Sequence, residues 1–194
     1  MKEVIDTYDK VSKNFIGNSN SLHNLGINSK KLENEATRII LNVLGLTNRE
    51  IIYTSGTSEN YSLILNNVDN DKKIVTDNKK FYEIGKEMYK NIVFDKELKI
   101  YSDTYLISTI NDLDLSNYKC LKHIQLKNKM KNYNNYDFIS MEEIPFFGCL
   151  IKTKNKNLKP IIHGGKSTTV YRSGTSPTPL IASLAKIIKI KYKK

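Results

Sequence analysis

The sequence predicts an α/β fold, because segments with helical periodicity alternate with short runs of β-branched and aromatic residues. Between residues 32 and 44 the apolar side chains recur at i, i+4, i+7 and i+8, which is the spacing of one helix face. Directly afterwards, a β-branched run at 50–54 stops at Ser55-Gly56 and is followed by another helical segment. Strand, tight turn and helix in this order form the repeating unit of an α/β domain.

Local signals set the bounds of the predicted elements. The first helix is expected to end at Gly45, since glycine tolerates the left-handed conformation that closes many helices. Thr57 can cap the next helix, which runs to Leu65. Residues 127–136 are polar and rich in lysine and asparagine, which predicts an exposed loop. The other predicted elements are strands at 73–76, 92–94, 105–110, 120–126, 138–140 and 146–151, and helices at 81–89 and 179–190.

Length and composition fit one domain covering residues 1–194. No run of about 18 apolar residues could span a bilayer, and the amino terminus lacks the basic-then-apolar order of a signal peptide, so a cytoplasmic protein is expected. Two cysteines, Cys120 and Cys149, are too few for a disulfide framework. The three histidines are widely separated and have no neighbouring cysteines, so no metal site is expected.

The formal net charge of +11 suits a partner with a phosphate backbone or an anionic surface. However, the lysines are spread along the chain, and the only arginines are Arg38, Arg49 and Arg172. Asn, Ile and Tyr are also abundant, and their A/T-rich codons point to a biased genome that would explain the lysine surplus without a ligand. A solvated basic surface is the simpler interpretation, and nucleic-acid binding is the alternative.

Two glycine-hydroxyl turns are candidate anion sites. Residues 54–59, Thr-Ser-Gly-Thr-Ser-Glu, join a strand to a helix, where backbone N–H groups and the helix dipole favour a negative charge. Residues 172–175, Arg-Ser-Gly-Thr, follow Gly164-Gly165 and precede the last helix. Small polar residues are also what any turn into a capped helix requires, so each turn alone has a purely structural interpretation as well.

Three motifs in the same order resemble those of the pyridoxal phosphate (PLP)-dependent cysteine desulfurases, within the class V aminotransferase group. Residues 17–23, Gly-Asn-Ser-Asn-Ser-Leu-His, resemble the family's Gly-Asn-Pro-Ser-Ser-x-His segment. Residues 50–59, Glu-Ile-Ile-Tyr-Thr-Ser-Gly-Thr-Ser-Glu, resemble its Glu-Ile-Ile-Phe-Thr-Ser-Gly-Ala-Thr-Glu. His-Gly-Gly at 163–165, Tyr-Arg-Ser-Gly-Thr at 171–175 and Pro-Leu-Ile-Ala at 179–182 resemble its third motif, Gly-Gly…Arg-Ser-Gly-Thr.

This resemblance implies a three-layer α/β/α sandwich like the large domain of fold-type I PLP-dependent transferases, with the small carboxy-terminal domain missing. It covers residues 11–67 and 137–188 well, and the segment from about 95 to 136 poorly. The missing domain would carry the mobile-loop cysteine that accepts sulfur and the arginine that holds the substrate carboxylate. Neither Cys120 nor Cys149 lies in the exposed, electropositive loop that activates a thiol.

The resemblance also implies a set of cofactor-binding residues and a homodimer. Ser58, with the backbone around Gly56 and Thr57, matches the loop that holds the PLP phosphate. Thr175 matches a hydroxyl that reaches the phosphate of the neighbouring subunit. Arg172 fits either the same loop or a structural anchor.

The residues that carry the family's chemistry are altered. PLP chemistry needs a lysine that holds the cofactor as a Schiff base, an acid at the pyridinium nitrogen and a ring stacked on its face. Asn78 stands at the position of the stacking histidine, and no carboxylate is in register around Gln125. Residues 137–140 match the strand that leads to the lysine, but Met-Glu-Glu-Ile-Pro-Phe follows at 141–146. Covalent attachment of PLP is therefore not expected, and no residue is assigned a catalytic role.

These observations leave three hypotheses. The first is a catalytically inactive or regulatory cysteine desulfurase homologue that pairs with itself or with a full-length paralogue. The second is one half of a split or minimal desulfurase, mobilising sulfur from cysteine for Fe–S clusters or tRNA thiolation, with lysine and cysteine supplied by a partner chain. Lys152 and Lys154 lie beyond the altered segment, and recruiting either would need a different site geometry. The third is a basic nucleic-acid-binding module.

Overall fold

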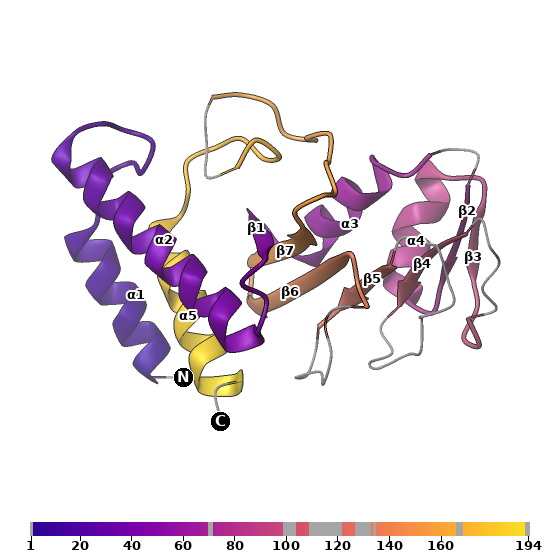
Figure 1. Ribbon diagram of the computed structural model, residues 1–194, viewed down its shortest axis with the longest axis horizontal. Coiled ribbons are helices and arrows are strands. Elements are labelled where there is room, and N and C mark those ends of the chain that lie inside the picture. The colour runs from indigo at the N-terminus through magenta and orange to yellow at the C-terminus, as the bar shows by residue number, and fades with distance from the viewer. Residues whose placement is uncertain are drawn as a thin grey trace.

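A mixed sheet of seven strands forms the centre of the protein (Figure 1). The computed structural model describes residues 2–69, 72–98, 104–108, 122–126, 133, 135–165 and 169–192. The strands are β1 (Arg49–Thr54), β2 (Lys73–Thr76), β3 (Ile92–Phe94), β4 (Thr104–Ser108), β5 (Lys122–Gln125), β6 (Phe138–Ile144) and β7 (Phe147–Thr153). Their order is β1-β7-β6-β5-β4-β2-β3, and β7 is antiparallel to both of its neighbours, whereas the other pairs are parallel.

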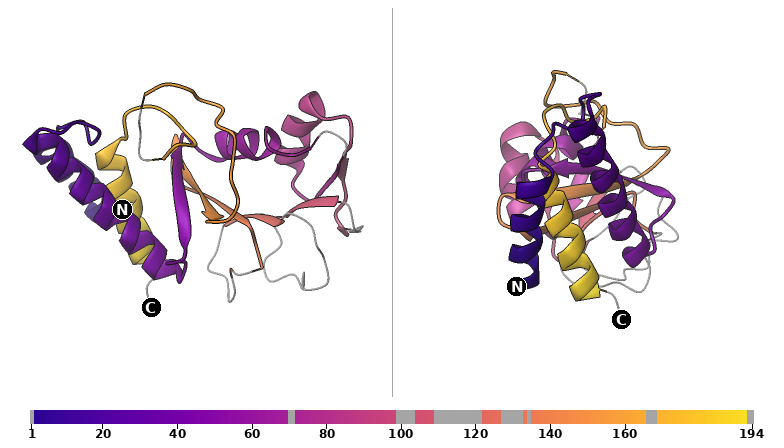
Figure 2. Two further views of the ribbon diagram at one scale, coloured as in Figure 1. Left: turned by 45° about the horizontal axis from the view of Figure 1, so that its top comes forward. Right: turned by 90° about the vertical axis from the view of Figure 1, so that its left-hand side faces the viewer.

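Helices cover both faces of this sheet (Figure 2). The helices of the described residues are α1 (Lys2–Asn14), α2 (Asn24–Leu44), α3 (Thr57–Leu65), α4 (Lys79–Met88) and α5 (Thr178–Tyr192). Helices α2 and α5 contribute to one hydrophobic core, and α3 and α4 contribute to a second core. Helix α1 packs against α5 on the outside of the first group. The predicted three-layer α/β/α sandwich is therefore confirmed.

The two cores arise from the alternation of side chains along each strand. In β7, Cys149 and Ile151 face the core of α2 and α5, while Leu150 between them faces the core of α3 and α4. All three side chains are fully buried. A fully buried aliphatic side chain contributes roughly 1.5–3 kcal/mol, so strands covered on both sides supply much of the stability.

Most predicted elements lie where the sequence placed them. Helix α3 and strands β2 and β3 have the predicted bounds, and α2 ends at Gly45 with a φ of 71° in the left-handed region. Helix α1 was not predicted, because it is polar and buries only Val11. Strand β6 was predicted to end at Ser140 but continues to Ile144, because it pairs with β7 along that length. Residues 109–110, 120–121 and most of 127–136 lie outside the described residues.

None of the helices within the described residues is long and apolar enough to cross a membrane.

Candidate functional site

Three of the four predicted phosphate-binding residues lie together at the start of α3. Gly56, Thr57 and Ser58 follow β1, in the turn of residues 54–59 that we call the α3 turn. Gly56 has a φ of 139°, in a region that residues with a side chain rarely adopt. Gly56 and Thr57 are buried, whereas Ser58 is exposed. A 2.8 Å hydrogen bond from the Thr54 hydroxyl to the Asn60 side chain joins the start of the turn to α3.

The amino terminus of α3 is bound by a carboxylate of the same chain. The Thr57 N–H and the Thr57 hydroxyl donate hydrogen bonds of 2.7 and 2.6 Å to Oε2 of Glu142. Hydrogen bonding by Thr57, helped by the charge of Lys80, outweighs the opposing effect of burial and lowers the pKa of Glu142 below its ordinary value. The carboxylate stays ionised at neutral pH and lies where the helix dipole favours negative charge.

The altered segment at residues 141–146 explains how Glu142 arrives there. Strands β6 and β7 form a hairpin, and their register shifts between Met141, paired with Cys149, and Ile144, paired with Phe147. Glu142 and Glu143 lie in this shift and bond on opposite sides of the sheet, as neighbours in a strand do. Glu143 accepts hydrogen bonds from Lys191 and Tyr192 of α5, while Glu142 reaches α3.

A second carboxylate closes the other side of the α3 turn. Glu59 accepts a 2.7 Å hydrogen bond from the Ser55 N–H and a 3.0 Å hydrogen bond from Nε of Arg172. Burial opposes ionisation of Glu59, but the hydrogen bonds from Ser55 and Arg172 outweigh it, so its pKa lies below the ordinary value. Arg172 thus ties the second glycine-hydroxyl motif to the first as a structural anchor.

Thr175, the fourth predicted residue, comes from the loop before α5. It is exposed and lines a pocket of about 210 Å³ together with Ser55, Arg172 and the turn residue Phe146. Thr175 therefore borders the same pocket as Ser55 of the α3 turn. The role implied for it, a contact with the phosphate of another subunit, involves a second chain and stays a prediction.

The residues at the positions implied for the cofactor ring bond to one another. The Tyr61 hydroxyl donates a 2.8 Å hydrogen bond to Oε1 of Gln125, and the Asn78 amide donates to the Tyr61 hydroxyl and, at 3.3 Å, to Gln125. Asn78 also caps α4, since its Oδ1 accepts from the Phe81 N–H at 3.1 Å. Tyr61 is fully buried, and burial raises the pKa of its hydroxyl, which stays protonated.

A buried histidine lies next to Tyr61. His123 Nε2 and the Ser140 hydroxyl are 2.7 Å apart, and the Tyr61 ring meets the His123 ring edge-on with centroids 5.6 Å apart. Burial lowers the pKa of His123 to about 3, so the ring is neutral at physiological pH. His123 is therefore a core residue of this face.

No lysine lies in the β6–β7 hairpin between Asp137 and Lys152, a segment that the structure describes throughout. Lys152 is buried at the far end of β7, four residues or about 13 Å along the strand from Gly148, which lies beside Gly56. Its Nζ is 2.6 Å from a Glu50 carboxylate oxygen and lies over the Tyr171 ring. Lys152 therefore does not reach the α3 turn from its strand.

The described cysteine is not a reactive thiol. Cys149 is fully buried in β7, and burial raises its pKa to about 12. Such a thiol carries almost no thiolate at neutral pH, and thiolate is the nucleophilic form. Cys120 lies outside the described residues. Within the described part of the chain, no group of three His, Cys, Asp or Glu residues could hold a metal ion.

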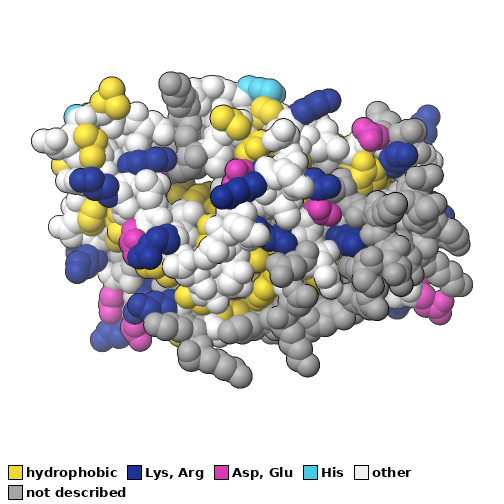
Figure 3. Space-filling view, in the orientation of Figure 1, with side chains coloured by type: hydrophobic (Ala, Val, Ile, Leu, Met, Phe, Trp, Pro, Cys, Tyr) yellow, Lys and Arg dark blue, Asp and Glu magenta, His cyan; other side chains and the backbone are white. Residues whose placement is uncertain are grey.

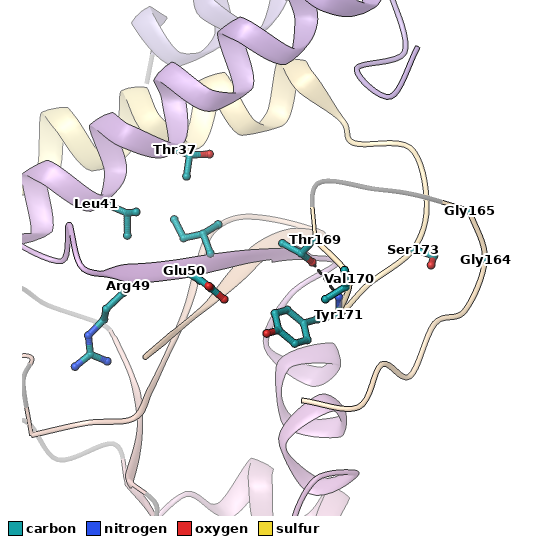
Figure 4. Close-up of a pocket in the computed structure, with 11 residues that line it drawn as sticks. Thr37, Leu41, Arg49, Glu50, Gly164, Gly165, Thr169, Val170, Tyr171 and Ser173 are labelled. Carbon is teal, nitrogen blue, oxygen red and sulfur yellow. Dashed lines mark hydrogen bonds between the residues drawn. The ribbon is translucent and has the colours of Figure 1, made fainter. Parts of the chain in front are cut away.

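A larger pocket of about 800 Å³ lies beside the edge strand β1 (Figure 4). Thr37 and Leu41 of α2 lie on one side of it, and Gly164, Gly165 and Ser173 lie on the loop at the other side. None of the α3-turn residues lines it. The Gly-Gly part of the third motif is thus separated from the helix terminus that the second motif forms.

Comparisons with known proteins show a sequence similarity over the first part of the chain and a similar fold over nearly all of it. The sequence profile of the family Aminotransferase class-V matches residues 1–87. Among solved structures, a NifS-like protein superposes with a TM-score of 0.85 at 21% identity, covering 98% of this chain and 66% of that chain. SspA in complex with cysteine superposes with 0.82 at 18% identity, covering 97% and 69%. A NifS-like protein from Rickettsia africae ESF-5 gives 0.83 at 19% identity, covering 98% and 65%.

The chain resembles the class-V aminotransferases. No curated protein sequence matches it significantly. At identities of 18 to 21% the solved structures show a shared fold, and the chain spans about two thirds of their length. PLP is accordingly the cofactor to which the family resemblance points.

The side chains as they stand do not fit a PLP phosphate at the α3 turn. A phosphate bound there would accept the hydrogen bonds of the helix terminus, but the Thr57 N–H and hydroxyl are already bonded to Glu142. From the sequence, Glu142 belongs only to an altered segment and Tyr61 only to a predicted helix, so neither is recognisable as a site residue. The one available signal was an acidic pair, Glu142-Glu143, at the end of a strand beside a predicted anion site.

Proposed function

We propose that this protein is a cysteine desulfurase-like homologue that has no desulfurase activity of its own and acts through a protein partner. The β6–β7 hairpin is the observation that carries this proposal. It occupies the segment where the resemblance places the Schiff-base lysine, and it runs from strand to strand through residues 141–146 without one. Without that lysine, the chain has no group there to hold the cofactor covalently or to move a proton at the substrate.

The remaining chemistry points the same way. Cys149 is buried and protonated, so it does not serve as a sulfur acceptor. Asn78 has no aromatic face, and its amide is engaged by Tyr61 and Gln125. In this proposal Gly56, Thr57, Ser58 and Thr175 are the remnant of a cofactor-binding loop.

The proposed mode of action is pairing in the cytoplasm, as a homodimer or with a full-length paralogue. Large hydrophobic side chains before and at the start of α2 support a contact surface: Ile16 is 72% exposed, Leu22 93% and Leu25 50%. Apolar groups gathered on a surface commonly mark a protein interface. A full-length paralogue that buries this segment would place the chain beside a complete enzyme, where it could regulate sulfur transfer.

Two alternatives make different predictions. A split desulfurase would need a lysine and a cysteine from a partner chain, and a neighbouring reading frame that encodes them would favour it. A nucleic-acid-binding module would need a continuous basic surface. On the face shown in Figure 3 the Lys and Arg side chains are dispersed among other residues, which does not favour that module.

The deciding experiment is incubation of the purified protein with PLP, borohydride reduction and mass mapping of any lysine adduct, together with assays of alanine and sulfide release from L-cysteine. We expect neither a stoichiometric adduct at a single lysine nor product above a protein-free control. A unique adduct with cysteine-dependent alanine formation would overturn the proposal. Size measurement across protein concentrations tests the pairing in the same samples.

A further inference from the structure

The amino terminus of α3 lacks a cap from its own N-cap residue. Gly56 has no side chain, and the group that completes the first turn is Glu142, 85 residues further along the chain from Thr57. We propose that Glu142 is a built-in substitute for the phosphate group, which closes the α3 turn to phosphorylated ligands. The chain thereby keeps the framework of an anion site and supplies the anion itself.

The geometry of the carboxylate supports this assignment. One oxygen, Oε2, accepts both the backbone N–H and the hydroxyl of Thr57. These are two of the donors that a helix terminus of this kind offers to a phosphate. The same oxygen packs against the backbone of Gly56, because a Cβ on Gly56 would lie 2.9 Å from it. A phosphate at this place would meet both a negative charge and a filled volume.

The hairpin holds Glu142 in position from the other side of the sheet. Glu143 is bonded to Lys191 and Tyr192 of α5 by hydrogen bonds of 2.8 to 3.0 Å. The hairpin backbone also lies close to the α3 turn, since a Cβ on Gly148 would lie 3.1 Å from the Gly56 Cα and would clash with the Met141 carbonyl. The position of Glu142 is thus built by several contacts.

An independent observation concerns the other half of the implied site. Tyr61 of α3 is fully buried and bonds both Asn78 and Gln125 through its hydroxyl. The side chains that the resemblance places at a cofactor ring are therefore satisfied by a ring of the chain itself. Internal groups replace both the anion and the ring contacts.

The experiment compares two adjacent substitutions with the same chemistry. Glu142→Gln removes the charge at the α3 turn, and Glu143→Gln removes it one residue away on the opposite face. Glu142 is exposed, so neither Glu142→Gln nor the larger truncation Glu142→Ala opens a core cavity, and both variants are expected to fold. The probes are inorganic phosphate and PLP, added at constant ionic strength.

We expect phosphate to raise the unfolding midpoint of Glu142→Ala and, to a smaller extent, of Glu142→Gln, because a ligand that binds only the folded state stabilises it. The apparent affinity should be at least about tenfold higher than in the wild-type protein and in Glu143→Gln. A parallel response to PLP would show that its phosphate uses the same place. Hydrogen exchange of the Thr57 amide, faster in the variants and slowed again by phosphate, locates the effect.

Two outcomes would overturn the inference: phosphate binding by the wild-type protein as tight as by Glu142→Ala, or no phosphate binding by either Glu142 variant. Both outcomes can be distinguished from a failure of the proposed function. A wild-type protein that binds phosphate without forming a lysine adduct would refute the substitute anion and leave the loss of desulfurase activity intact.

Discussion

Helices α3 and α4 lie on the same face of the sheet, and each begins just after a strand, but their first turns are completed in different ways. At α4 the N-cap Asn78 bonds the Phe81 N–H with its own side chain, three residues away. At α3 the N-cap Gly56 has no side chain, and the turn is completed by Glu142 from a distant hairpin. The α4 terminus is capped by a residue close to it in sequence, whereas the α3 terminus depends on a contact made by the tertiary fold.

This difference shows what an anion-binding turn keeps when its ligand is replaced. A helix with no role in binding can take a side-chain cap at its own N-cap position, as α4 does with Asn78. The α3 turn keeps glycine, which leaves room for an external group, and a carboxylate now fills that room. The comparison predicts that substitutions at the two helices will differ in size, in pH dependence and in their response to anions.

The largest effect is expected at the glycine of the α3 turn. Gly56→Ala places a Cβ 2.9 Å from Glu142 and forces alanine to adopt a φ of 139° and a ψ of −166°. Backbone strain of this kind costs about 1–3 kcal/mol, and this range is the expected loss, because the close contact is with the flexible end of the exposed Glu142 side chain, which can shift. The control Gly45→Ala has a φ of 71° with nothing within 4 Å of its Cβ.

Gly45→Ala should therefore cost only about 1 kcal/mol, the penalty of a left-handed residue. Urea denaturation of both variants measures the difference through the transition midpoint. Equal losses at the two glycines would mean that the space filled by Glu142 does not matter to Gly56.

The next effect is expected at the cap of α4. Asn78→Ala removes the bond to the Phe81 N–H and leaves the buried Tyr61 hydroxyl with one partner fewer, so a loss of about 1–2 kcal/mol is expected. Asn78→Ser keeps a capping oxygen but is too short to reach Tyr61. The difference between these variants in urea unfolding reports the Tyr61 contact, and equal stabilities would show that the cap alone counts.

Local signals in the sequence predicted most of the fold. The bounds of α3 follow from a β-branched strand, a glycine turn and a threonine, all within residues 50–65. The capping role predicted for Thr57 was wrong, because Gly56 is the N-cap and the Thr57 hydroxyl donates to Glu142. The end of α2 follows from Gly45. Helix α1 was missed because most of its residues are polar and only Val11 is buried.

Only the part of the site that is formed by neighbouring residues in the sequence was predictable. Gly56, Thr57 and Ser58 form a recognisable turn because their conformation is determined by neighbours in sequence. Glu142 could not be found in this way, since its contact with Thr57 depends on a register shift between two strands. Tyr61 looked like an ordinary helix residue because its partners, Asn78 and Gln125, come from two other elements.

A smaller, pH-dependent effect is expected at Glu142. Its pKa is lowered in the folded protein, mainly by the Thr57 hydrogen bonds. The stability it contributes is therefore fully present above the ordinary value of 4.5 and is lost as the pH falls through the lower folded-state pKa. Because Glu142 is exposed, Glu142→Gln should cost only about 0.5–1 kcal/mol at pH 7.

Urea unfolding of wild type and Glu142→Gln at pH 7, 5, 4 and 3 measures this dependence. The two proteins should differ above pH 5 and converge toward pH 3. Because the charge of Lys80 helps to keep Glu142 ionised, the difference in unfolding free energy between the two proteins should decrease slightly with added salt. A difference that persists unchanged at the lowest pH would show that shape rather than charge sets the contribution of Glu142.

The smallest effects are expected at Ser58 and Thr175, the two exposed residues of the predicted phosphate-binding set. Substitution by alanine should change the unfolding free energy of the isolated chain by less than about 0.5 kcal/mol, as is usual for surface sites. Any larger effect must then come from a ligand or from a second chain. Unfolding measured over a hundredfold range of protein concentration separates these cases, because only a subunit contact makes the Thr175→Ala loss grow with concentration. A concentration-dependent loss at Thr175 alone would place this hydroxyl at a subunit contact, while the α3 turn remains closed by Glu142.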